Sequence, residues 1–536
     1  MSLITGKIVL KETKFLSDKI QMKINMKSLI LSTFLISSLL AREWVETTTA
    51  QPTEPVWTTQ VNSPSEIEIS FDLGGYFLQE LSNGKKQISF PGGVPNLEEG
   101  SPDLPRMAHS IIIPDLAHME LSIIESEFVD IPMEDIVSSK GNLTRNIDPS
   151  TVPYTYGEAY QSDEFYPENI VFMRDPYILR TVRGQAIVFQ PIQYNPIQRI
   201  LRVYSYIKIN VKENGFSKIN PLTRRPDKDG SREFENIYAD HFLNYTTNSR
   251  YEQLGEHGPM LVICYADFMD SMQPFVDWKN YKGIPTEMVD VAEIGGSDEI
   301  ETFVENKYYE NGIAFVLLVG DIDEIPSPRY SDGAGSNSPA DPSYGFMAGN
   351  DYYPEIIVGR FSAQNTTHVE TMVNRTIMYE MNPDPTADWY KKGSGFASDQ
   401  GPGDDGELDY EHLDNIRDDL LGFTYSEVDQ IYDPTGTVED GEIALNDGRS
   451  IVNYTGHGSN GSWGNGCPMN QTNVNGLTNA EKWPFIWSVA CVNGEFHIGT
   501  CFAETWLRAT DSDGTPTGAI AVLMSTVNQS RAPPMD

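Results

Sequence analysis

Few cysteines and few basic residues characterise this sequence, and each shortage excludes a class of protein. The 536 residues include only four cysteines, too few for a fold held together by a framework of disulfides. The 38 Lys and Arg residues stand against 77 Asp and Glu residues, so the formal net charge is −39. Nucleic-acid binding requires clustered positive charge, so we exclude a nucleic-acid partner and expect a basic one.

Long hydrophobic runs are also scarce. One run near the N-terminus, residues 29–41 (LILSTFLISSLLA), follows Met26 and Lys27. It is too short to span a bilayer, and its basic flank and small residues near the end are typical of a secretory signal. We therefore predict a signal region at residues 1–41, with Met26 as an alternative start, a secreted or bacterial cell-surface location, and no membrane-spanning segment.

Hydrophobic periodicity divides the rest of the chain. Residues 42–211 show mostly two-residue alternation, for example in 66–71 and 201–211, which predicts an all-β domain. Residues 212–250 are polar and charged, as in NPLTRRPDKDGSREF, and we interpret them as an exposed linker.

From residue 251 onward, short apolar runs alternate with stretches of helical periodicity. The runs are 260–264, 313–319, 356–358, 451–454, 485–490 and 519–524, and the helical stretches are 268–281, 299–309, 369–379, 410–421 and 502–510. Apolar strands separated by helices predict a largely parallel sheet with helices on both faces. Functional groups of such a sheet lie where its strands end.

Two of these strand ends carry an imidazole and a thiol. The run 451–454 leads into a turn where glycines flank His457, and the run 485–490 leads directly into Cys491. A thiol with an ordinary pKa of about 8.5 needs a neighbouring base or cation to act as a nucleophile, and an imidazole supplies either. The pattern favours Cys–His catalysis, with backbone N–H groups of Gly458 and Cys491 as an oxyanion hole.

Other interpretations of these residues stay open at this point. A cysteine that ends a buried strand is more often a small core residue, and a Gly-His-Gly turn is often only a turn. A zinc site from His457, Cys467, Cys491 and His497 is a further alternative. Its spacings of 9, 23 and 5 intervening residues lack the close pairs of common structural zinc sites.

Longer motifs around these residues resemble the gingipain family of secreted bacterial cysteine peptidases. The motifs are NYTGHGS at 453–459, SVACVNGEF at 488–496, CFAETWLRA at 501–509, PTGAIAVLMSTVNQS at 516–530, FVDWKNYKG at 275–283, LLVGDIDEIP at 317–326, YGFMAGNDYY at 344–353 and VGRFSA at 358–363. FPGGVPNLEEGSPDLP at 90–105 resembles the family's propeptide. The resemblance implies an α/β caspase-like catalytic domain at 251–536, preceded by an all-β propeptide domain.

The resemblance also implies roles for individual residues. Cys491 is then the nucleophile and His457 the general acid and base of an endopeptidase that cleaves after a basic residue, with Arg expected before Lys. The family's specificity carboxylate matches Asp409 in the acidic segment 404–412, for which a solvated loop is the alternative interpretation. No cofactor is required for catalysis, and the implied partners are basic protein or peptide substrates and the chain's own propeptide.

Two features depart from the family pattern. The family's acidic partner of the histidine aligns with Gln400, and Asp399 is its neighbour. Either Asp399 takes this role through a one-residue shift, or Gln400 orients the imidazole without a charge. Family chains also continue past the matched part with further domains, so we expect Asp536 to mark a truncation of the catalytic domain.

The propeptide carries two further hypotheses. Arg145 lies in a polar loop between β-patterned runs and is predicted to insert into the Asp409 pocket as a substrate mimic, with an ordinary surface arginine as the alternative. Cleavage between Arg250 and Tyr251 is the predicted activation step. Competing sites in the same polar stretch are Arg224, Arg225 and Arg232.

Calcium binding and a non-enzymatic role are the remaining hypotheses. The family binds calcium structurally, and Asp321 and Asp323 offer oxygen ligands, with helix caps or solvated loops as the alternative. The rival to the enzyme is a non-catalytic surface or adhesion protein that retains the peptidase fold. The presence of both Cys491 and His457 favours the enzyme, because a binding module has no need of a thiol beside a Gly-flanked imidazole.

Overall fold

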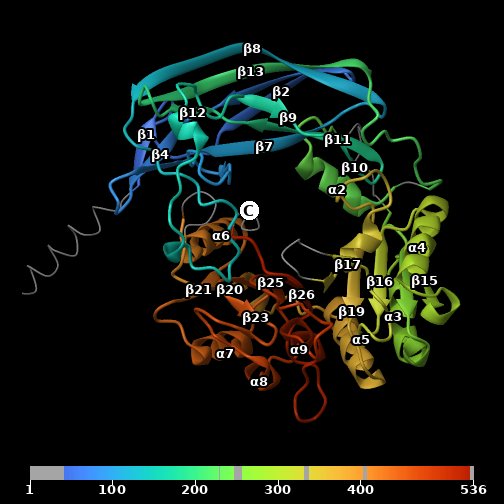
Figure 1. The fold of residues 1–536 in the computed structure, drawn as a ribbon. Coiled ribbons are helices and arrows are strands. Elements are labelled where there is room, and N and C mark those ends of the chain that lie inside the picture. Colours follow the sequence, from blue (N-terminus) through green and yellow to red (C-terminus); the bar gives the residue numbers. More distant parts are fainter. Residues whose placement is uncertain (1–41, 229, 247–255, 331–336, 402–406, 532–536) are drawn as a thin grey trace, which may run out of the picture.

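The computed structural model describes residues 42–228, 230–246, 256–330, 337–401 and 407–531. The predicted signal region and the predicted cleavage point between Arg250 and Tyr251 lie outside these ranges. Within them, no helix combines the length and apolar character needed to cross a bilayer. Figure 1 shows a β-rich N-terminal region that lies over two α/β units.

The N-terminal region consists of antiparallel sheets, which confirms the prediction of β structure there. The strand orders are β12-β13-β3-β2 with β8, β10-β11-β7-β6 with β9, and β1-β4-β5. The bounds are β1 Glu43–Glu46, β2 Val56–Ser63, β3 Glu66–Asp72, β4 Gly75–Glu80, β5 Lys86–Ser89, β6 Val94–Pro95, β7 Pro105–Ile112, β8 Ala117–Pro132, β9 Val171–Met173, β10 Tyr177–Leu179, β11 Val182–Phe189, β12 Ile192–Asn195 and β13 Ile200–Phe216. In β3, the alternate residues Ile67, Ile69 and Phe71 are buried in the core, as the two-residue period predicts.

The described part of the segment 212–250 is not exposed throughout, as a linker would be. A helix, α2 (Arg232–His241), forms within it. Phe234 and Tyr238 lie four positions apart on one face of α2, and both are buried against residues of β10. The polar composition of the segment conceals an amphipathic helix, because two aromatic residues at helical spacing are enough to bury one face.

The C-terminal region contains two parallel sheets, where we predicted a single one. Their orders are β15-β14-β16-β19 and β21-β20-β22-β25-β26. The strands are β14 Met260–Cys264, β15 Thr286–Asp290, β16 Phe315–Val319, β19 Ile357–Phe361, β20 Lys392–Ala397, β21 Glu427–Tyr432, β22 Ile451–Thr455, β25 Phe485–Val489 and β26 Ala521–Met524, with short pairs β17 Arg329–Tyr330 and β18 Ser338–Pro339, and β23 Gly458–Ser459 and β24 Ser462–Trp463. The helices are α3 Met269–Tyr281, α4 Ser297–Asn311, α5 Thr366–Met381, α6 Asp409–Phe423, α7 Val438–Asp447, α8 Gln471–Asn475 and α9 Phe502–Arg508.

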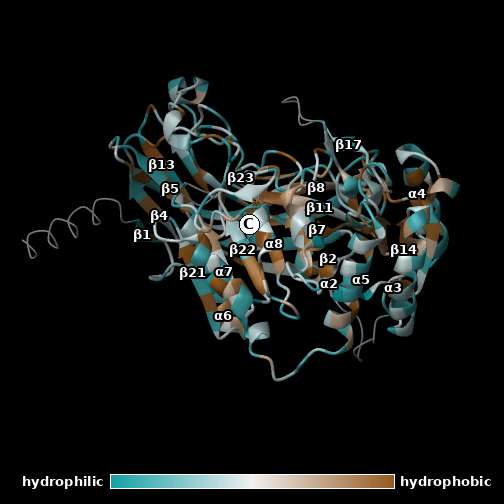
Figure 2. Ribbon diagram, turned by 90° about the horizontal axis from the view of Figure 1, so that it is seen from below, coloured by the Kyte–Doolittle hydropathy of each residue, from teal (hydrophilic) through white to brown (hydrophobic). Residues whose placement is uncertain are grey.

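The predicted strands and helices of this region are all present, with small shifts at their ends. The sequence pattern does not reveal β15, β20, β21, α7 or α8. The sequence of β20, KGSGFA, holds two glycines and no apolar run, yet the strand is central to its sheet and mostly buried. Figure 2 shows hydrophobic residues concentrated in the strands, with hydrophilic residues on helices such as α5.

Buried arginines join the parts of the molecule. Arg375 of α5 donates hydrogen bonds to the carbonyl oxygens of Leu507, Ala519 and Ala509 at 2.8, 2.9 and 3.1 Å. These bonds connect the first α/β unit, which contains the sheet β15-β14-β16-β19, to the second, which contains the sheet β21-β20-β22-β25-β26. Arg180 of the N-terminal region donates to three carbonyl oxygens of the first unit at 2.8 to 3.0 Å. The N-terminal region is therefore anchored to the C-terminal region by buried polar contacts as well as by packing.

Candidate active site

Cys491 and His457 follow the carboxyl ends of two neighbouring strands. β22 and β25 pair in parallel, with Thr455 opposite Val489. The turn that carries His457 therefore lies beside Cys491, which follows Ala490. Gly458 makes this approach feasible, because a Cβ atom on it would lie 2.6 Å from the carbonyl oxygen of Cys491. The predicted placement of the thiol and the imidazole at adjacent strand ends is confirmed.

Hydrogen bonds connect the turn that follows Cys491 to the turn that carries His457. Asn493 Nδ2 donates to the carbonyl oxygens of Ser459 and Ser462 at 2.7 and 3.0 Å, which ties the cysteine turn to the histidine turn. Val492 adopts a φ of 49°, which is costly for a β-branched residue. Its N–H donates to the carbonyl oxygen of Val527 at 3.0 Å, so the surrounding chain fixes this conformation. Asn493 is a site residue that the sequence analysis did not identify.

Gln400, rather than Asp399, is the neighbour of the imidazole. His457 Nε2 lies 2.9 Å from Gln400 Oε1, while Asp399 is exposed to solvent. The backbone carbonyl of Gln400 accepts a hydrogen bond from the N–H of Asp409 at 2.8 Å, so the same residue contacts both the histidine and the start of α6. Of the two alternatives that the sequence leaves open, the geometry selects the uncharged one.

Asp409 forms a buried ion pair with Arg145 of the N-terminal region. Arg145 Nη1 lies 3.1 and 3.0 Å from the two carboxylate oxygens, and each side chain is only 1% exposed. The hydroxyl of Ser398 donates to the same carboxylate. Asp409 also lies in the first turn of α6, where the helix dipole favours a negative charge. Asp409 is therefore not in the solvated loop of the alternative interpretation, and Arg145 is not a surface arginine.

Arg145 enters the site on a turn, in which the N–H of Ile147 donates to the carbonyl oxygen of Thr144 at 3.0 Å. The N–H of Arg145 donates to the carbonyl oxygen of Gln529 at 2.7 Å, and the N–H of Arg531 donates to that of Leu143 at 2.9 Å. Thr144 and Ser530 form an antiparallel bridge between these two bonds. The backbone of Arg145 also lies close enough to Cys491 and His457 to affect the pKa of both groups. A single antiparallel bridge of this kind holds the turn with Arg145 against residues 529–531.

Burial keeps both reactive groups in their neutral forms. Burial raises the pKa of the Cys491 thiol above its usual value, and backbone hydrogen bonds from Gln529 and the Arg145 charge oppose this only in part. Burial also lowers the pKa of His457, and the nearby Arg531 charge lowers it further. Cys491 is only 2% exposed while the Arg145 segment lies over it. The thiol of Cys491 is thus shielded from solvent, while His457 stays partly exposed.

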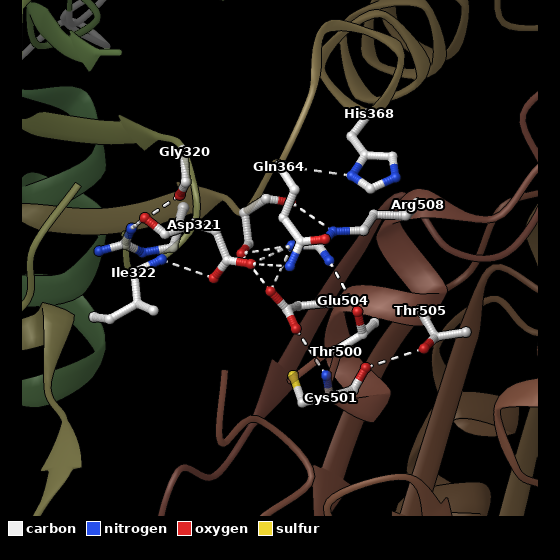
Figure 3. A network of polar contacts seen from close by, with 12 residues as sticks. Gly320, Asp321, Ile322, Gln364, His368, Thr500, Cys501, Glu504, Thr505 and Arg508 are labelled. Carbon is white, nitrogen blue, oxygen red and sulfur yellow. Dashed lines mark hydrogen bonds and ion pairs between the residues drawn. The ribbon is translucent and has the colours of Figure 1, made fainter. Parts of the chain in front are cut away.

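The calcium hypothesis does not fit the contacts of Asp321 and Asp323. Figure 3 shows the buried carboxylate of Asp321 facing Gln364 and Arg508, which donate to it at 2.7 and 3.1 Å. Asp323 is exposed. A guanidinium therefore supplies the positive charge that a calcium ion would supply. Among the described residues, which include all four of the zinc alternative, no group of three or more His, Cys, Asp or Glu side chains could hold a metal ion.

The chain belongs to peptidase family C25. The family model described as "Peptidase family C25" matches residues 253–534, and the one described as "Propeptide_C25" matches residues 51–250. The resemblance to the gingipains is confirmed over most of this chain. Gingipain R1 of Porphyromonas gingivalis is 37% identical over 88% of this chain and 48% of its own length. Gingipain R2 of the same species is 37% identical over 91% of this chain and 67% of its own length. The chain thus spans about half of one relative and two thirds of the other.

More distant relatives and solved structures agree with this assignment. Lys-gingipain of Porphyromonas gingivalis is 27% identical over 87% of this chain and 28% of its own length. The crystal structure titled Arg specific cysteine proteinase gingipain R has 38% sequence identity and a TM-score of 0.50, covering 54% of this chain and 67% of that chain. The complex of Porphyromonas gingivalis RgpB pro- and mature domains has 39% identity and a TM-score of 0.50, covering 52% and 66%.

Proposed function

We propose that this chain is the zymogen of a secreted or cell-surface cysteine endopeptidase with a caspase-like catalytic domain, which cleaves peptide bonds after arginine. Cys491 is the nucleophile, His457 the general acid and base, and Asp409 the carboxylate that binds the substrate's arginine. The β-rich N-terminal region is the propeptide, and its Arg145 occupies the position of that arginine. Membership of peptidase family C25 and the 37% identity to gingipains R1 and R2 support the proposal.

One observation carries the proposal. The Arg145 side chain pairs with Asp409 in a buried pocket, while the backbone of the same residue lies close enough to Cys491 and His457 to affect the pKa of both. A substrate arginine bound in this way presents its carbonyl carbon to the thiol. Cleavage after arginine requires that one residue bind in the specificity pocket and lie beside the nucleophile at the same time.

The reaction follows from these positions. His457 accepts the thiol proton as Cys491 Sγ attacks the carbonyl carbon of the arginine, forming a C–S bond and a tetrahedral oxyanion. The C–N bond then breaks, and His457 gives the proton to the leaving amine, which leaves a thioester on Cys491. Water, deprotonated by His457, hydrolyses the thioester and returns the thiol. N–H groups of Gly458 and Cys491 are the proposed donors to the oxyanion.

Two observations favour arginine over lysine. The residue that the propeptide places against Asp409 is itself an arginine, and its Nη1 contacts both carboxylate oxygens. Sequence identity is also higher to gingipains R1 and R2, at 37%, than to Lys-gingipain, at 27%.

Activation by cleavage after Arg250 is the proposed route to the active enzyme. The propeptide model ends at residue 250 and the peptidase model begins at residue 253, so the boundary of the two family models surrounds the Arg250–Tyr251 bond. An enzyme that cleaves after arginine would process this bond itself. N-terminal sequencing of the activated chain is expected to read Tyr251-Glu252-Gln253-Leu254.

The test compares two reporter peptides that differ only in Arg or Lys before the cleaved bond. For the activated full chain, we expect kcat/KM for the Arg peptide to be higher by about tenfold or more, because the guanidinium pairs with both oxygens. Cys491→Ala should cleave neither peptide. Cys264→Ala, which removes a buried thiol from β14, is the matched control. Near-normal turnover by Cys491→Ala would contradict the proposal.

A further inference from the structure

Arg531 lies near the cleavage position, and its charge interacts with Asp409 as well as with Asp148. Its guanidinium is buried, with the residue 5% exposed. Nη2 donates to the carbonyl oxygen of Ile147 at 3.2 Å and to Oε1 of Gln400 at 3.0 Å. Counting from Arg145, Ile147 is the second residue after the bond that faces Cys491. Arg531 therefore contacts the part of the propeptide that corresponds to the leaving half of a substrate.

The backbone of Arg531 contacts the other half of the same segment. Its N–H donates to the carbonyl oxygen of Leu143, two residues before Arg145. Arg531 thus holds the bound chain on both sides of the cleavage position, through its main chain on one side and its guanidinium on the other. A residue in this position contacts the bound chain beyond the arginine that pairs with Asp409, so it can affect which residues are preferred there.

The guanidinium of Arg531 can donate a further hydrogen bond. Among the described residues, Nε of Arg531 is buried and has no hydrogen-bond partner. The next acidic group along the propeptide is Asp148, which carries opposite charge and interacts electrostatically with Arg531. Its carboxylate instead accepts a hydrogen bond from the N–H of Ser150 at 2.8 Å, at the start of the turn Pro149–Thr151. A substrate without this turn leaves its carboxylate free to approach the guanidinium.

We propose that Arg531 is a specificity-determining residue for the leaving half of the substrate, which binds the carbonyl of the second residue after the cleaved bond and favours Asp or Glu at the third. This inference rests on the proposed function and extends it. The enzyme then recognises two charges of opposite sign, an arginine at Asp409 and an acidic residue at Arg531. The strongly acidic chain gains from Arg531 a local positive charge at the site.

The experiment uses the activated full chain and two peptides that share the sequence Leu-Thr-Arg-Asn-Ile of the propeptide. One continues with Asp and the other with Asn, and neither contains the following proline. We expect the wild-type kcat/KM to be about twofold to fivefold higher for the Asp peptide at low salt, with the ratio falling as salt is added. Any general loss of activity in a variant cancels in this ratio.

Two variants test the assignment to Arg531. Arg531→Gln should bring the Asp/Asn ratio to about one, and Arg531→Glu should invert the preference in favour of a peptide with Lys at the third position. Arg417→Gln, which removes a partly exposed positive charge from α6, should keep the wild-type ratio. A ratio of one in the wild-type chain, or a ratio that survives Arg531→Gln, overturns this inference alone. If the wild-type chain cleaves neither peptide, the proposed function is overturned and the inference with it.

Discussion

Arg145 and Asp409 are separated by 264 positions in the sequence, and they form an ion pair in which one nitrogen contacts both carboxylate oxygens at 3.1 and 3.0 Å. Neither side chain is more than 1% exposed. A buried charge that loses its partner is strongly destabilising, because it stays desolvated without compensation. In the proposed function, this pair therefore links the latency of the zymogen to the preference for arginine.

Removing Arg145 should weaken latency. Arg145→Ala leaves Asp409 without a partner in the closed site, so the propeptide binds less tightly and the initial rate of the unprocessed chain on a small Arg substrate should rise about tenfold or more. Arg145→Lys keeps the charge and should give an intermediate rate. An unprocessed Arg145→Ala chain that stays as inactive as the wild type would show that other contacts maintain latency.

Removing the charge of Asp409 should abolish the preference for arginine. Asp409→Asn keeps the shape of the pocket but loses the ion pair with the substrate, at a cost of about 3 to 5 kcal/mol, or roughly two to three orders of magnitude in kcat/KM. Glu411→Gln, a change of the same kind on the same turn of α6, is the control. The measurement is the ratio of kcat/KM for Arg and neutral peptides, and an unchanged ratio in Asp409→Asn would place the pocket elsewhere.

Gln400 should act as a positioning residue for His457. Its side chain accepts from the imidazole at 2.9 Å, and loss of one such hydrogen bond costs about 1 kcal/mol, or roughly fivefold in kcat. We expect Gln400→Ala to lower kcat by this factor with little change in KM. Asp399→Ala is the control, because Asp399 is exposed and its loss should leave the pH profile of kcat unaltered. A lower kcat for Asp399→Ala with an unchanged kcat for Gln400→Ala would instead support Asp399 as the partner of His457.

Arg180 should hold the propeptide on the first α/β unit after the linker is cut. Its guanidinium donates to the carbonyl oxygens of Gly312, Ile313 and Glu355 at 2.8 to 3.0 Å. Losing buried charged hydrogen bonds of this kind costs about 2 to 5 kcal/mol. Arg180→Ala should therefore release the cleaved propeptide during gel filtration, whereas Arg202→Ala, which breaks a partly exposed pair with Asp130, should retain it. Retention by both variants would contradict the anchoring role.

The placement of the reactive groups could be predicted because it depends on local pattern. An apolar run that ends at Cys491 and a glycine-flanked His457 are visible in the sequence, and parallel pairing brings such strand ends together. The central strand β20 could not be predicted in this way. Its glycines give it low β propensity, and it is buried because β21 and β22 pair on either side of it.

Long-range partners account for the rest of what the sequence does not show. Gln529 contributes a backbone carbonyl and Arg531 a backbone N–H to the bound segment, and neither contact depends on a recognisable motif. The helix α2 was concealed by its charged residues, although Phe234 and Tyr238 at a spacing of four are a signal for it. Asp321 was predicted as a calcium ligand because the sequence does not show that its carboxylate is paired with Arg508. The two residues are 187 positions apart.

The most direct test of the account is covalent labelling by a thiol-directed probe that carries arginine, with the modified residue located by mass spectrometry. Before activation, the Arg145 segment covers Cys491 and burial raises its pKa, so the thiol stays protonated at neutral pH and labelling should be slow, rising only as the pH increases. After activation, the pocket is free and Cys491 should be labelled rapidly at neutral pH, while Cys264, Cys467 and Cys501 remain unmodified in the core. Labelling at one of those three residues, or equal rates before and after activation, would contradict the claim that Cys491 is the nucleophile and that the propeptide covers it.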